Sequence, residues 1–375
     1  MFKQAICSCA AAFLVLWACV PVSAAAEQSP TVSASAAIVT EAETGRVLFA
    51  KNAEEKRAMA STTKIMTALL ALEQEDREVT ITEDMVRVEG SSMGLRAGDR
   101  LMLHDLAAGM LSVSGNDAAN AAALLIDGSL EAFADRMNRR AAELGLSSTH
   151  FVTPSGLDAE GHETTALDLA RLACAALQNE DFLALASSPA VSVTFLESAE
   201  TRTYENHNKL LSLMDGCIGV KTGYTKKAGR CLVSAAEQNG IRLIAITLQA
   251  PDDWNDHQAL MEYGFSLVER FQTPEDPFRG SVPVTGGTSE DVLVFGEQET
   301  GSPMLKEEAD RVERRVELPR FLYAPIREGI PVGTVSYWLD GEEIASFSLY
   351  AGEDIARKET EPSFWDQIAA FFGWK

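Results

Sequence analysis

Three short motifs in the chain carry residue types suited to nucleophilic catalysis. The first is Ser61-Thr62-Thr63-Lys64, the only Ser-x-x-Lys in the sequence, at the start of an apolar helical pattern. Residues three apart share a helix face, so the lysine amine can reach the serine hydroxyl. Lysine ordinarily titrates at about 10.4 and can serve as a base only when neutral. Burial, a helix N-terminus or a second cation would lower its pKa. Taken alone, the serine could equally be a helix cap.

The second and third motifs are also unique in the chain. Ser114-Gly115-Asn116 falls in a short polar connection between two helical patterns, where a simple Asn- or Asp-stabilised turn is the alternative. Lys221-Thr222-Gly223 follows an apolar strand pattern that begins at Cys217. Glycine at that position would let a substrate backbone approach the strand edge. Because each motif occurs once and in this order, the three together predict one active site.

In this combination the motifs resemble those of the penicillin-recognising serine enzymes. The closer resemblance is to the low-molecular-mass penicillin-binding proteins, the D-alanyl-D-alanine carboxypeptidases. It rests on residues 60–67, 114–118 and 219–225, and on 153–158 followed by His162 and residues 165–166. The resemblance implies an α+β catalytic domain of the transpeptidase type that penicillin-binding proteins and β-lactamases share, followed by a small all-β domain and a C-terminal amphipathic helix.

The resemblance also implies a role for each motif residue. Ser61 would be the nucleophile, Lys64 its general base, and Ser114 the relay that passes a proton to the leaving D-alanine. The substrate-binding residues would be Asn116, Lys221, Thr222, Gly223 and Tyr224.

Within that binding group, Asn116 would hold the peptide amide of the substrate. Lys221 would lower the pKa of Lys64 and, with Thr222, receive the terminal carboxylate. Backbone amides at positions 61 and 224 would form the oxyanion hole. A polar stretch at 206–211 resembles one that precedes the Lys-Thr-Gly strand in the family, and no role is assigned to it.

The implied activity is removal of the terminal D-alanine from peptidoglycan stem pentapeptides through an acyl-enzyme on Ser61, with β-lactams as inhibitors and no cofactor. Three alternatives remain. A β-lactamase of class A would need a Glu-x-x-x-Asn pattern between the second and third motifs, and none occurs there. A D,D-endopeptidase would cut cross-links with the same residues. A non-catalytic wall-binding protein would usually lack a motif residue.

The elements expected to position these motifs alternate between strand and helix patterns from about residue 29 to 273. Residues 35–52 predict two strands around a Glu-Thr-Gly-Arg turn. The helix that begins at the first motif places Ile65, Ala68, Leu69 and Leu72 on one apolar stripe. Alanine-rich helices follow, and then strands between 217 and 250. Strands at both ends with helices between them favour one α+β catalytic domain over residues 27–275.

The chain changes character after this segment. Short alternating runs predict a small β-rich domain over 276–352, and 353–362 is expected to be a polar tether. Residues 363–375 form an amphipathic pattern with one aromatic face. A helix of this kind could dock on its own protein, but the tether favours a lipid interface, namely the outer leaflet of the cytoplasmic membrane.

The N-terminus predicts export. Lys3 precedes an apolar run from 5 to 20 and then small residues, which is typical of a secretory signal peptide spanning 1–26. The alternatives are a retained anchor and a lipoprotein signal at Cys19, which Trp17 disfavours. The expected location is the extracytoplasmic face of the cytoplasmic membrane or the cell wall.

Composition bears on nucleic-acid binding, metal binding and disulfide formation. The 375 residues carry a formal charge of −23, which excludes a nucleic-acid backbone binder. The five histidines form no zinc-type spacing, so no metal site is predicted. Removal of the signal would leave Cys174, expected to be buried, and Cys217 and Cys231, which could form a bridge but favour simple core packing.

Overall fold

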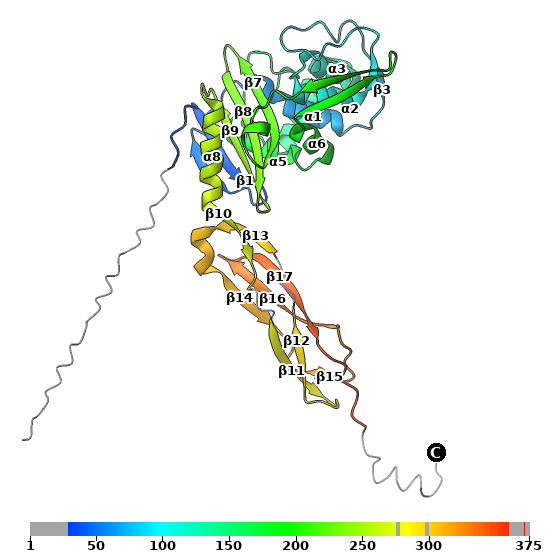
Figure 1. The fold of residues 1–375 in the computed structure, drawn as a ribbon, viewed down its shortest axis with the longest axis vertical. Helices are drawn as coiled ribbons and strands as arrows, with labels where there is room; N and C mark the ends of the chain where they lie inside the picture. The colour runs from blue at the N-terminus through cyan, green and yellow to red at the C-terminus, as the bar shows by residue number, and fades with distance from the viewer. Residues whose placement is uncertain (1–28, 275–277, 297–299, 360–370, 372–375) are drawn as a thin grey trace, which may run out of the picture.

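The strands at the two ends of the catalytic segment pair in the computed structural model, which describes residues 29–274, 278–296, 300–359 and 371. They form a five-stranded antiparallel sheet in the order β2-β1-β9-β8-β7 (Figure 1). Its strands are β1 (Ala36–Glu41), β2 (Val47–Lys51), β7 (Cys217–Thr225), β8 (Gly229–Gln238) and β9 (Ile241–Leu248). The predicted hairpin at 35–52 is confirmed as β1 and β2.

Helices cover both faces of this sheet, which explains why its central strands are apolar throughout. Successive residues of β1 point to opposite sides: Ile38 joins the larger hydrophobic cluster, and Val39 joins the cluster beneath α8 (Asp253–Leu267). The larger cluster lies toward the remaining helices. These are α1 (Lys64–Leu72), α2 (Leu103–Ser112), α3 (Asn116–Asp127), α4 (Leu130–Glu143), α5 (Ala166–Ala176), α6 (Glu180–Ser187) and the short α7 (Leu210–Leu213).

Helix α1 is preceded by one turn of 3₁₀ helix, Ala60–Thr63. The predicted helix is confirmed, but the expectation of a single apolar stripe is wrong, because all nine residues of α1 are buried. The cause is its position inside the helical layer, where α2, α3, α5 and α6 surround it. The lysine of the first motif is therefore removed from solvent together with the helix that carries it.

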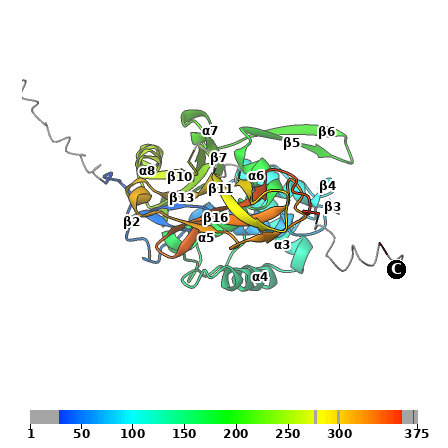
Figure 2. The ribbon, with the colours of Figure 1, turned by 90° about the horizontal axis from the view of Figure 1, so that it is seen from below.

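Two small ribbons complete this part of the chain. Strands β3 (Glu78–Thr80) and β4 (Arg100–Met102) pair with each other, as do β5 (Ala190–Phe195) and β6 (Glu200–Glu205). The β5–β6 hairpin projects from the side of the catalytic domain (Figure 2). Strand β6 leads directly into residues 206–209, which reach the cleft described below.

The C-terminal part is rich in strands, as predicted. A six-stranded sheet has the order β14-β16-β17-β12-β11-β15, and β10 pairs separately with β13. The strands are β10 (Val268–Gln272), β11 (Arg279–Thr285), β12 (Asp291–Phe295), β13 (Thr300–Leu305), β14 (Glu313–Glu317), β15 (Leu322–Tyr323), β16 (Pro331–Leu339) and β17 (Glu342–Ala351), with a 3₁₀ turn at Lys306–Arg311. This domain continues from the end of α8 (Figure 1).

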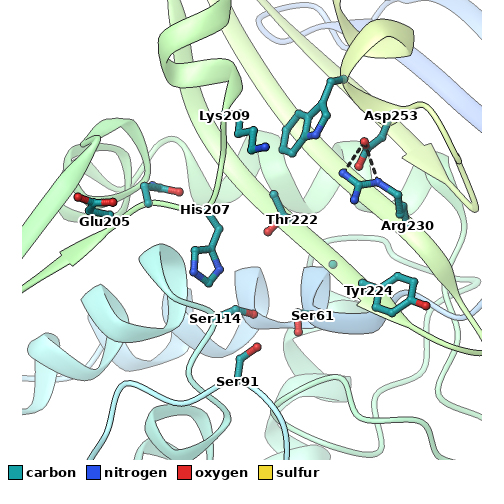
Figure 3. Close-up of a pocket in the computed structure, with 13 residues that line it drawn as sticks. Ser61, Ser91, Ser114, Glu205, His207, Lys209, Thr222, Tyr224, Arg230 and Asp253 are labelled. Carbon is teal, nitrogen blue, oxygen red and sulfur yellow. Dashed lines mark hydrogen bonds and ion pairs between the residues drawn. The ribbon is translucent and has the colours of Figure 1, made fainter.

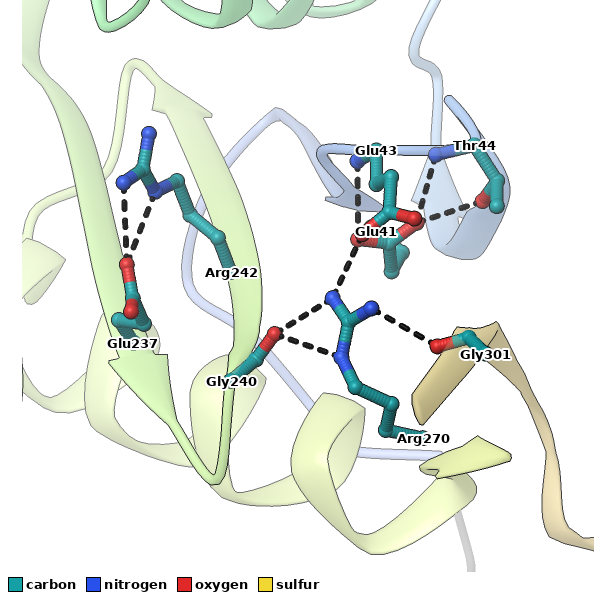
Figure 4. Close-up of polar contacts among 8 residues, drawn as sticks. All are labelled: Glu41, Glu43, Thr44, Glu237, Gly240, Arg242, Arg270 and Gly301. Carbon is teal, nitrogen blue, oxygen red and sulfur yellow. Dashed lines mark hydrogen bonds and ion pairs between the residues drawn. The ribbon is translucent and has the colours of Figure 1, made fainter. Parts of the chain in front are cut away.

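The junction between the two domains combines the packing of Val268 and Leu305 against the cluster beneath α8 with a set of polar contacts centred on Arg270 of β10 (Figure 4). Its guanidinium donates to the carbonyl of Gly240 at the β8–β9 turn, to the carbonyl of Gly301 in β13 at 2.9 Å, and to Glu43 at 2.6 Å. A second ion pair joins Arg46 to Glu308. One arginine thus connects three segments that are distant in sequence, and all its contacts are hydrogen bonds to charged or carbonyl oxygens.

Several expectations concern cysteines and chain ends. Cys174, Cys217 and Cys231 are free thiols, so 217 and 231 do not form a bridge. Cys231 is buried, whereas Cys174 is only half-buried, contrary to expectation, because it lies in the wall of a cavity that Leu177 and Arg242 also line. The signal peptide at 1–26 lies outside the described residues, as does the helix at 363–375 except for Phe371. None of the described helices is long and apolar enough to cross a membrane.

Candidate active site

The three motifs converge at a cavity of about 550 Å³ between β7 and the helical layer (Figure 3). Ser61, Ser114, Thr222, Gly223 and Tyr224 line it. The other three predicted site residues, Lys64, Asn116 and Lys221, are buried behind its wall. Hydroxyl, backbone and other polar groups thus line the cavity, while the amines of Lys64 and Lys221 and the amide of Asn116 lie beneath its surface.

The turn that carries Ser61 is held by the stretch at 153–158. Gly156 has a φ of +82°, and a Cβ atom there would lie 2.0 Å from the carbonyl oxygen of Ala60. Only glycine fits this close approach. The hydroxyl of Thr67 also donates to the carbonyl of Pro154 at 2.6 Å, and the hydroxyl of Thr63 lies 2.8 Å from Nε2 of His162. The stretch at 153–158, to which the sequence assigned no role beyond its resemblance to the family, therefore packs against the turn that carries the nucleophile.

Lys64 is completely buried and contacts three oxygen atoms. Its Nζ lies 3.0 Å from Oγ of Ser61, 2.7 Å from Oδ1 of Asn116 and 2.5 Å from the carbonyl oxygen of Ser155. Burial lowers the pKa of Lys64 well below its usual value, and the nearby charge of Lys221 lowers it further, while Asp117 acts in the opposite direction. The predicted proximity of lysine and serine is present, and the lowered pKa favours the neutral amine relative to an exposed lysine.

The first turn of α3 organises the wall opposite β7. The amide nitrogen of Asn116 donates to the carbonyl of Glu89 at 2.6 Å, so both ends of this side chain are engaged within the protein. The next residue, Asp117, accepts hydrogen bonds from three successive backbone amides, at 93, 94 and 95, and from the Ser92 hydroxyl. Asp117 thereby shapes the loop that brings Ser91 to the cavity. Sequence reasoning assigned no role to this carboxylate.

Ser114 lies between α2 and α3 with a φ of +60°, an uncommon conformation for a residue with a side chain. It is 5% exposed and lines the cavity beside Ser61 (Figure 3). The neighbouring Gly115 is required by close packing, since a Cβ there would lie 2.8 Å from Oδ1 of Asp117. The second motif is therefore a strained connection that directs a hydroxyl into the cavity, rather than a simple surface turn.

Strand β7 forms the other wall and packs directly on the nucleophile turn. A Cβ on Gly223 would lie 3.1 Å from the backbone nitrogens of both Ser61 and Thr62. Lys221 is 1% exposed, and its Nζ donates to the carbonyl of Thr222 at 2.8 Å. Burial lowers the pKa of Lys221 to about 7. Lys221 and Thr222 point to opposite faces of the strand, because side chains alternate along it.

Residues outside the motifs complete the cavity. Glu205 at the end of β6 lines it, as do Asn206, His207 and Lys209 of the segment that follows. Burial, followed by the charge of Lys221, lowers the pKa of His207. Ser91 lines it beside Ser114, and Arg230, Asp253 and Trp254 lie away from these serines (Figure 3). No motif marks Arg230, Asp253 or Trp254, which reach the cleft through the pairing of β8 with β7 and the start of α8. Among the described residues, no group of three His, Cys, Asp or Glu side chains could hold a metal ion.

Comparisons with known proteins agree with this geometry. The family profile described as D-alanyl-D-alanine carboxypeptidase, peptidase family S11, matches residues 23–252, and the profile of the C-terminal domain of penicillin-binding protein 5 matches residues 270–357. The chain is 33% identical to the D-alanyl-D-alanine carboxypeptidase DacF of Bacillus subtilis, over 86% of each chain. It is 34% identical to DacC of Escherichia coli, a protein of the same name, over 96% of this chain and 94% of the relative.

Among solved structures, penicillin binding protein 5 of Haemophilus influenzae is similar with a TM-score of 0.63 and 29% identity. The match covers 88% of this chain and 99% of the other. The catalytic segment and the β-rich segment are thus matched in order by sequence, and nearly the whole chain is matched by structure. The resemblance on which the sequence interpretation rests is confirmed, and the chain belongs to the D-alanyl-D-alanine carboxypeptidase family of serine peptidases, S11.

Proposed function

We propose that this chain is a serine-type D-alanyl-D-alanine carboxypeptidase that removes the terminal D-alanine of peptidoglycan stem peptides through an acyl-enzyme on Ser61. Family membership supports the activity. The observation that carries the residue assignment is the environment of the Lys64 amine, 3.0 Å from the Ser61 hydroxyl.

The hydrogen bonds of Lys64 support its role as general base. A neutral amine has two N–H donors and one lone pair. The carbonyl of Ser155 can only accept, and so can Oδ1 of Asn116, whose nitrogen is committed to another carbonyl. These two acceptors take both donors, which leaves the lone pair for the proton of Ser61. The same two contacts hold the amine in position while its protonation state changes.

The reaction then proceeds as acyl transfer. The oxygen of Ser61 attacks the carbonyl carbon between the two terminal D-alanines, and its proton passes to Lys64. Ser114, adjacent in the cavity, relays a proton to the nitrogen of the leaving D-alanine as the C–N bond breaks. Backbone amides at 61 and 224 stabilise the developing oxyanion. Water attacks the ester in the second step, with Lys64 again as the base, and regenerates the free serine.

In this proposal Asn116 acts chiefly by fixing Lys64, because its side-chain oxygen and nitrogen already have protein partners. Lys221 acts electrostatically by lowering the pKa of Lys64, as its buried position favours. Gly223 admits β7 to the nucleophile turn, so that a substrate strand can lie along the exposed edge of β7.

The proposed organisation of the chain follows the sequence interpretation. Residues 1–26 are the export signal, 27–275 the catalytic domain, 276–352 the β-rich domain, 353–362 a tether and 363–375 an amphipathic helix at the outer leaflet of the cytoplasmic membrane. The described chain supports this arrangement, because it leaves the β-rich domain near β15, at the end remote from the catalytic domain (Figure 1). The cleft would then stand away from the lipid surface.

The direct test is release of D-alanine from a peptide ending in D-Ala-D-Ala by the full-length mature chain. We expect release by the native protein and none by Ser61→Ala. A cross-linked dimer peptide added in parallel measures endopeptidase activity. Cleavage of the dimer alone would overturn the carboxypeptidase assignment. Hydrolysis of benzylpenicillin faster than of the peptide would indicate a β-lactamase, and binding without turnover would indicate a wall-binding protein.

A further inference from the structure

The edge strand β15 and the turn after it carry apolar side chains on their exposed side. Successive residues of this segment alternate between two sides, as in any strand. Leu322, Ala324 and Ile326 pack in the hydrophobic cluster of the β-rich domain, while the residues between them are exposed. The outward positions of a solvated sheet are normally polar. Here they form an aromatic edge that consists of Phe321, Tyr323 and Pro325.

The two rings of the aromatic edge are unusually exposed. Tyr323 is 70% and Phe321 47% exposed, and their rings form an edge-to-face pair with centroids 5.2 Å apart. Natural sheets commonly protect an edge strand with charged side chains. The opposite edge of the same sheet, β14, follows this rule with Glu313, Arg314, Arg315 and Glu317. One edge of the domain is therefore protected by charge, and the other presents aromatic rings.

The aromatic edge lies where the described chain leaves the β-rich domain. Tyr323 pairs with Thr285 of β11, and the amide of Lys358 donates to the carbonyl of the next residue, Gly286, at 2.9 Å. Phe364, the first aromatic residue of the amphipathic tail pattern, follows six residues after Lys358. Six residues span at most about 22 Å. A surface that binds the tail is therefore within reach of the aromatic edge, at the end remote from the catalytic domain (Figure 1).

A lipid interface fits the size and chemistry of the aromatic edge. Aromatic side chains bury about 150–250 Å² each, so the two rings offer at most about 500 Å². Each partner in a stable protein interface typically buries about 800 Å², which makes a second protein copy a poor match. Tyrosine concentrates at membrane surfaces, where its apolar ring and its polar hydroxyl are both accommodated.

The charges around the aromatic edge permit this contact. Both signs occur there on exposed side chains, including Arg320, Arg357 and Lys358 as well as Glu290, Asp291 and Glu359. The chain as a whole has a formal charge of −23, which an anionic leaflet would repel. At this end the cations offset part of that repulsion, so the rings rather than the charges would supply the contact.

We propose that the aromatic edge inserts into the outer interface of the membrane to which the tail binds, so that the β-rich domain touches the lipid at a second point. This inference rests on the membrane location proposed above and deepens it, because a tail alone would not orient the folded domains. The tail keeps the edge near the lipid at a high effective concentration, so a weak contact suffices. The two contacts together direct the catalytic cleft away from the lipid.

The test measures how much of the full-length mature chain sediments with vesicles of phosphatidylethanolamine and phosphatidylglycerol. Phe321→Ser/Tyr323→Ser should lower the partition coefficient roughly 10-fold, because the exposed parts of two aromatic side chains no longer enter an apolar phase. The conservative pair Phe321→Leu/Tyr323→Trp should bind as the native chain does. Phe295→Ser/Tyr350→Ser is the matched control, since it removes one Phe and one Tyr, 43% and 39% exposed, that pair across β12 and β17. The control should also partition as the native chain does.

Thermal unfolding followed by circular dichroism verifies that each variant is folded. An unchanged partition coefficient in Phe321→Ser/Tyr323→Ser would overturn the proposal and leave the tail as the membrane contact. A larger loss in Phe295→Ser/Tyr350→Ser would also overturn it, since the contact would then lie on β12 and β17. A native chain that stays in the supernatant would refute the membrane location and this inference together. Release of D-alanine, measured without vesicles, tests the carboxypeptidase assignment separately, and neither pair of serine substitutions should alter it.

Discussion

Replacement of Gly156 by alanine should inactivate the enzyme through one atom placed outside the cavity. The new Cβ would lie 2.0 Å from the carbonyl oxygen of Ala60, whereas real contacts of this kind are not shorter than 3.0 Å, so the two groups must separate by at least 3.0 − 2.0 = 1.0 Å. Ala60 precedes the nucleophile Ser61 directly. A displacement of about 1 Å in a reacting group can reduce the rate on the order of 100-fold.

The same substitution should destabilise the fold. Alanine at a φ of +82° costs about 1–2 kcal/mol, and the added crowding costs about 1–3 kcal/mol more. We therefore expect Gly156→Ala to lower the free energy of unfolding by about 2–5 kcal/mol and the acylation rate by about 100-fold. Denaturant titration and a fluorescent penicillin measure the two effects separately at a temperature where the variant is folded.

Gly161→Ala is the matched control for this prediction. Gly161 has a similar φ of +76°, but the nearest atom to an added Cβ is Nδ1 of His150 at 3.6 Å, an ordinary contact. The Gly161→Ala variant should therefore lose about 1–2 kcal/mol of the free energy of unfolding through backbone strain, and its acylation rate should be unchanged. Equal rates in the two variants would refute the claim that the 153–158 stretch sets the position of the nucleophile.

Four further predictions concern Lys221, Asp117 and the domain junction. Because the pKa of Lys221 is lowered to about 7, the unfolded chain binds one more proton than the folded chain between pH 7 and about pH 10. The free energy of unfolding should therefore rise with pH over this range. In Lys221→Met, denaturant titrations should no longer show this rise. The same variant should move the acid limb of the kcat/KM profile, measured from pH 5 to 9, to higher pH, because the pKa of Lys64 rises when its neighbouring cation is removed; an unmoved limb would argue against coupling. Asp117→Asn should lower the free energy of unfolding by about 1–3 kcal/mol, since an amide side chain cannot accept all four hydrogen bonds from the Ser92 hydroxyl and the backbone amides at 93–95. It should also expose the 91–95 loop to proteolysis, and unchanged cleavage would contradict the proposed role of Asp117 in holding this loop. Arg270→Ala should broaden the distribution of domain orientations in small-angle scattering while leaving acylation unchanged, and an identical scattering curve would show that other contacts hold the junction.

The sequence was most informative where chemistry depends on short spacing. Ser61 and Lys64 are three residues apart, so one helical turn brings them together, and the structure places them at hydrogen-bond distance. The spacing of apolar residues predicted a helix with one apolar stripe, yet α1 is wholly buried. Hydroxyl groups of this helix and of the turn before it donate to nearby carbonyls, as Thr67 does to Pro154 at 2.6 Å and Thr62 to Met59 at 2.7 Å. Such local partners do not show in a hydrophobic pattern.

The sequence was least informative where function depends on strand register. Arg230 enters the cleft because it lies opposite Tyr224 in the β7–β8 pair, and Asp253 meets it because α8 begins beside the same strand. Neither relation has a fixed sequence spacing. The separation of Lys221 from Thr222 across the strand likewise follows from alternation within a buried sheet rather than from the motif itself.

The most direct test of the account is intact-mass spectrometry of the full-length mature chain after incubation with benzylpenicillin, followed by peptide mapping. We expect one adduct with the mass of the drug, located on Ser61, absent from Ser61→Ala and formed more slowly as Lys64 becomes protonated at acid pH. An adduct on another residue, or full acylation of Ser61→Ala, would contradict the assignment of Ser61 as the nucleophile and with it the proposed mechanism.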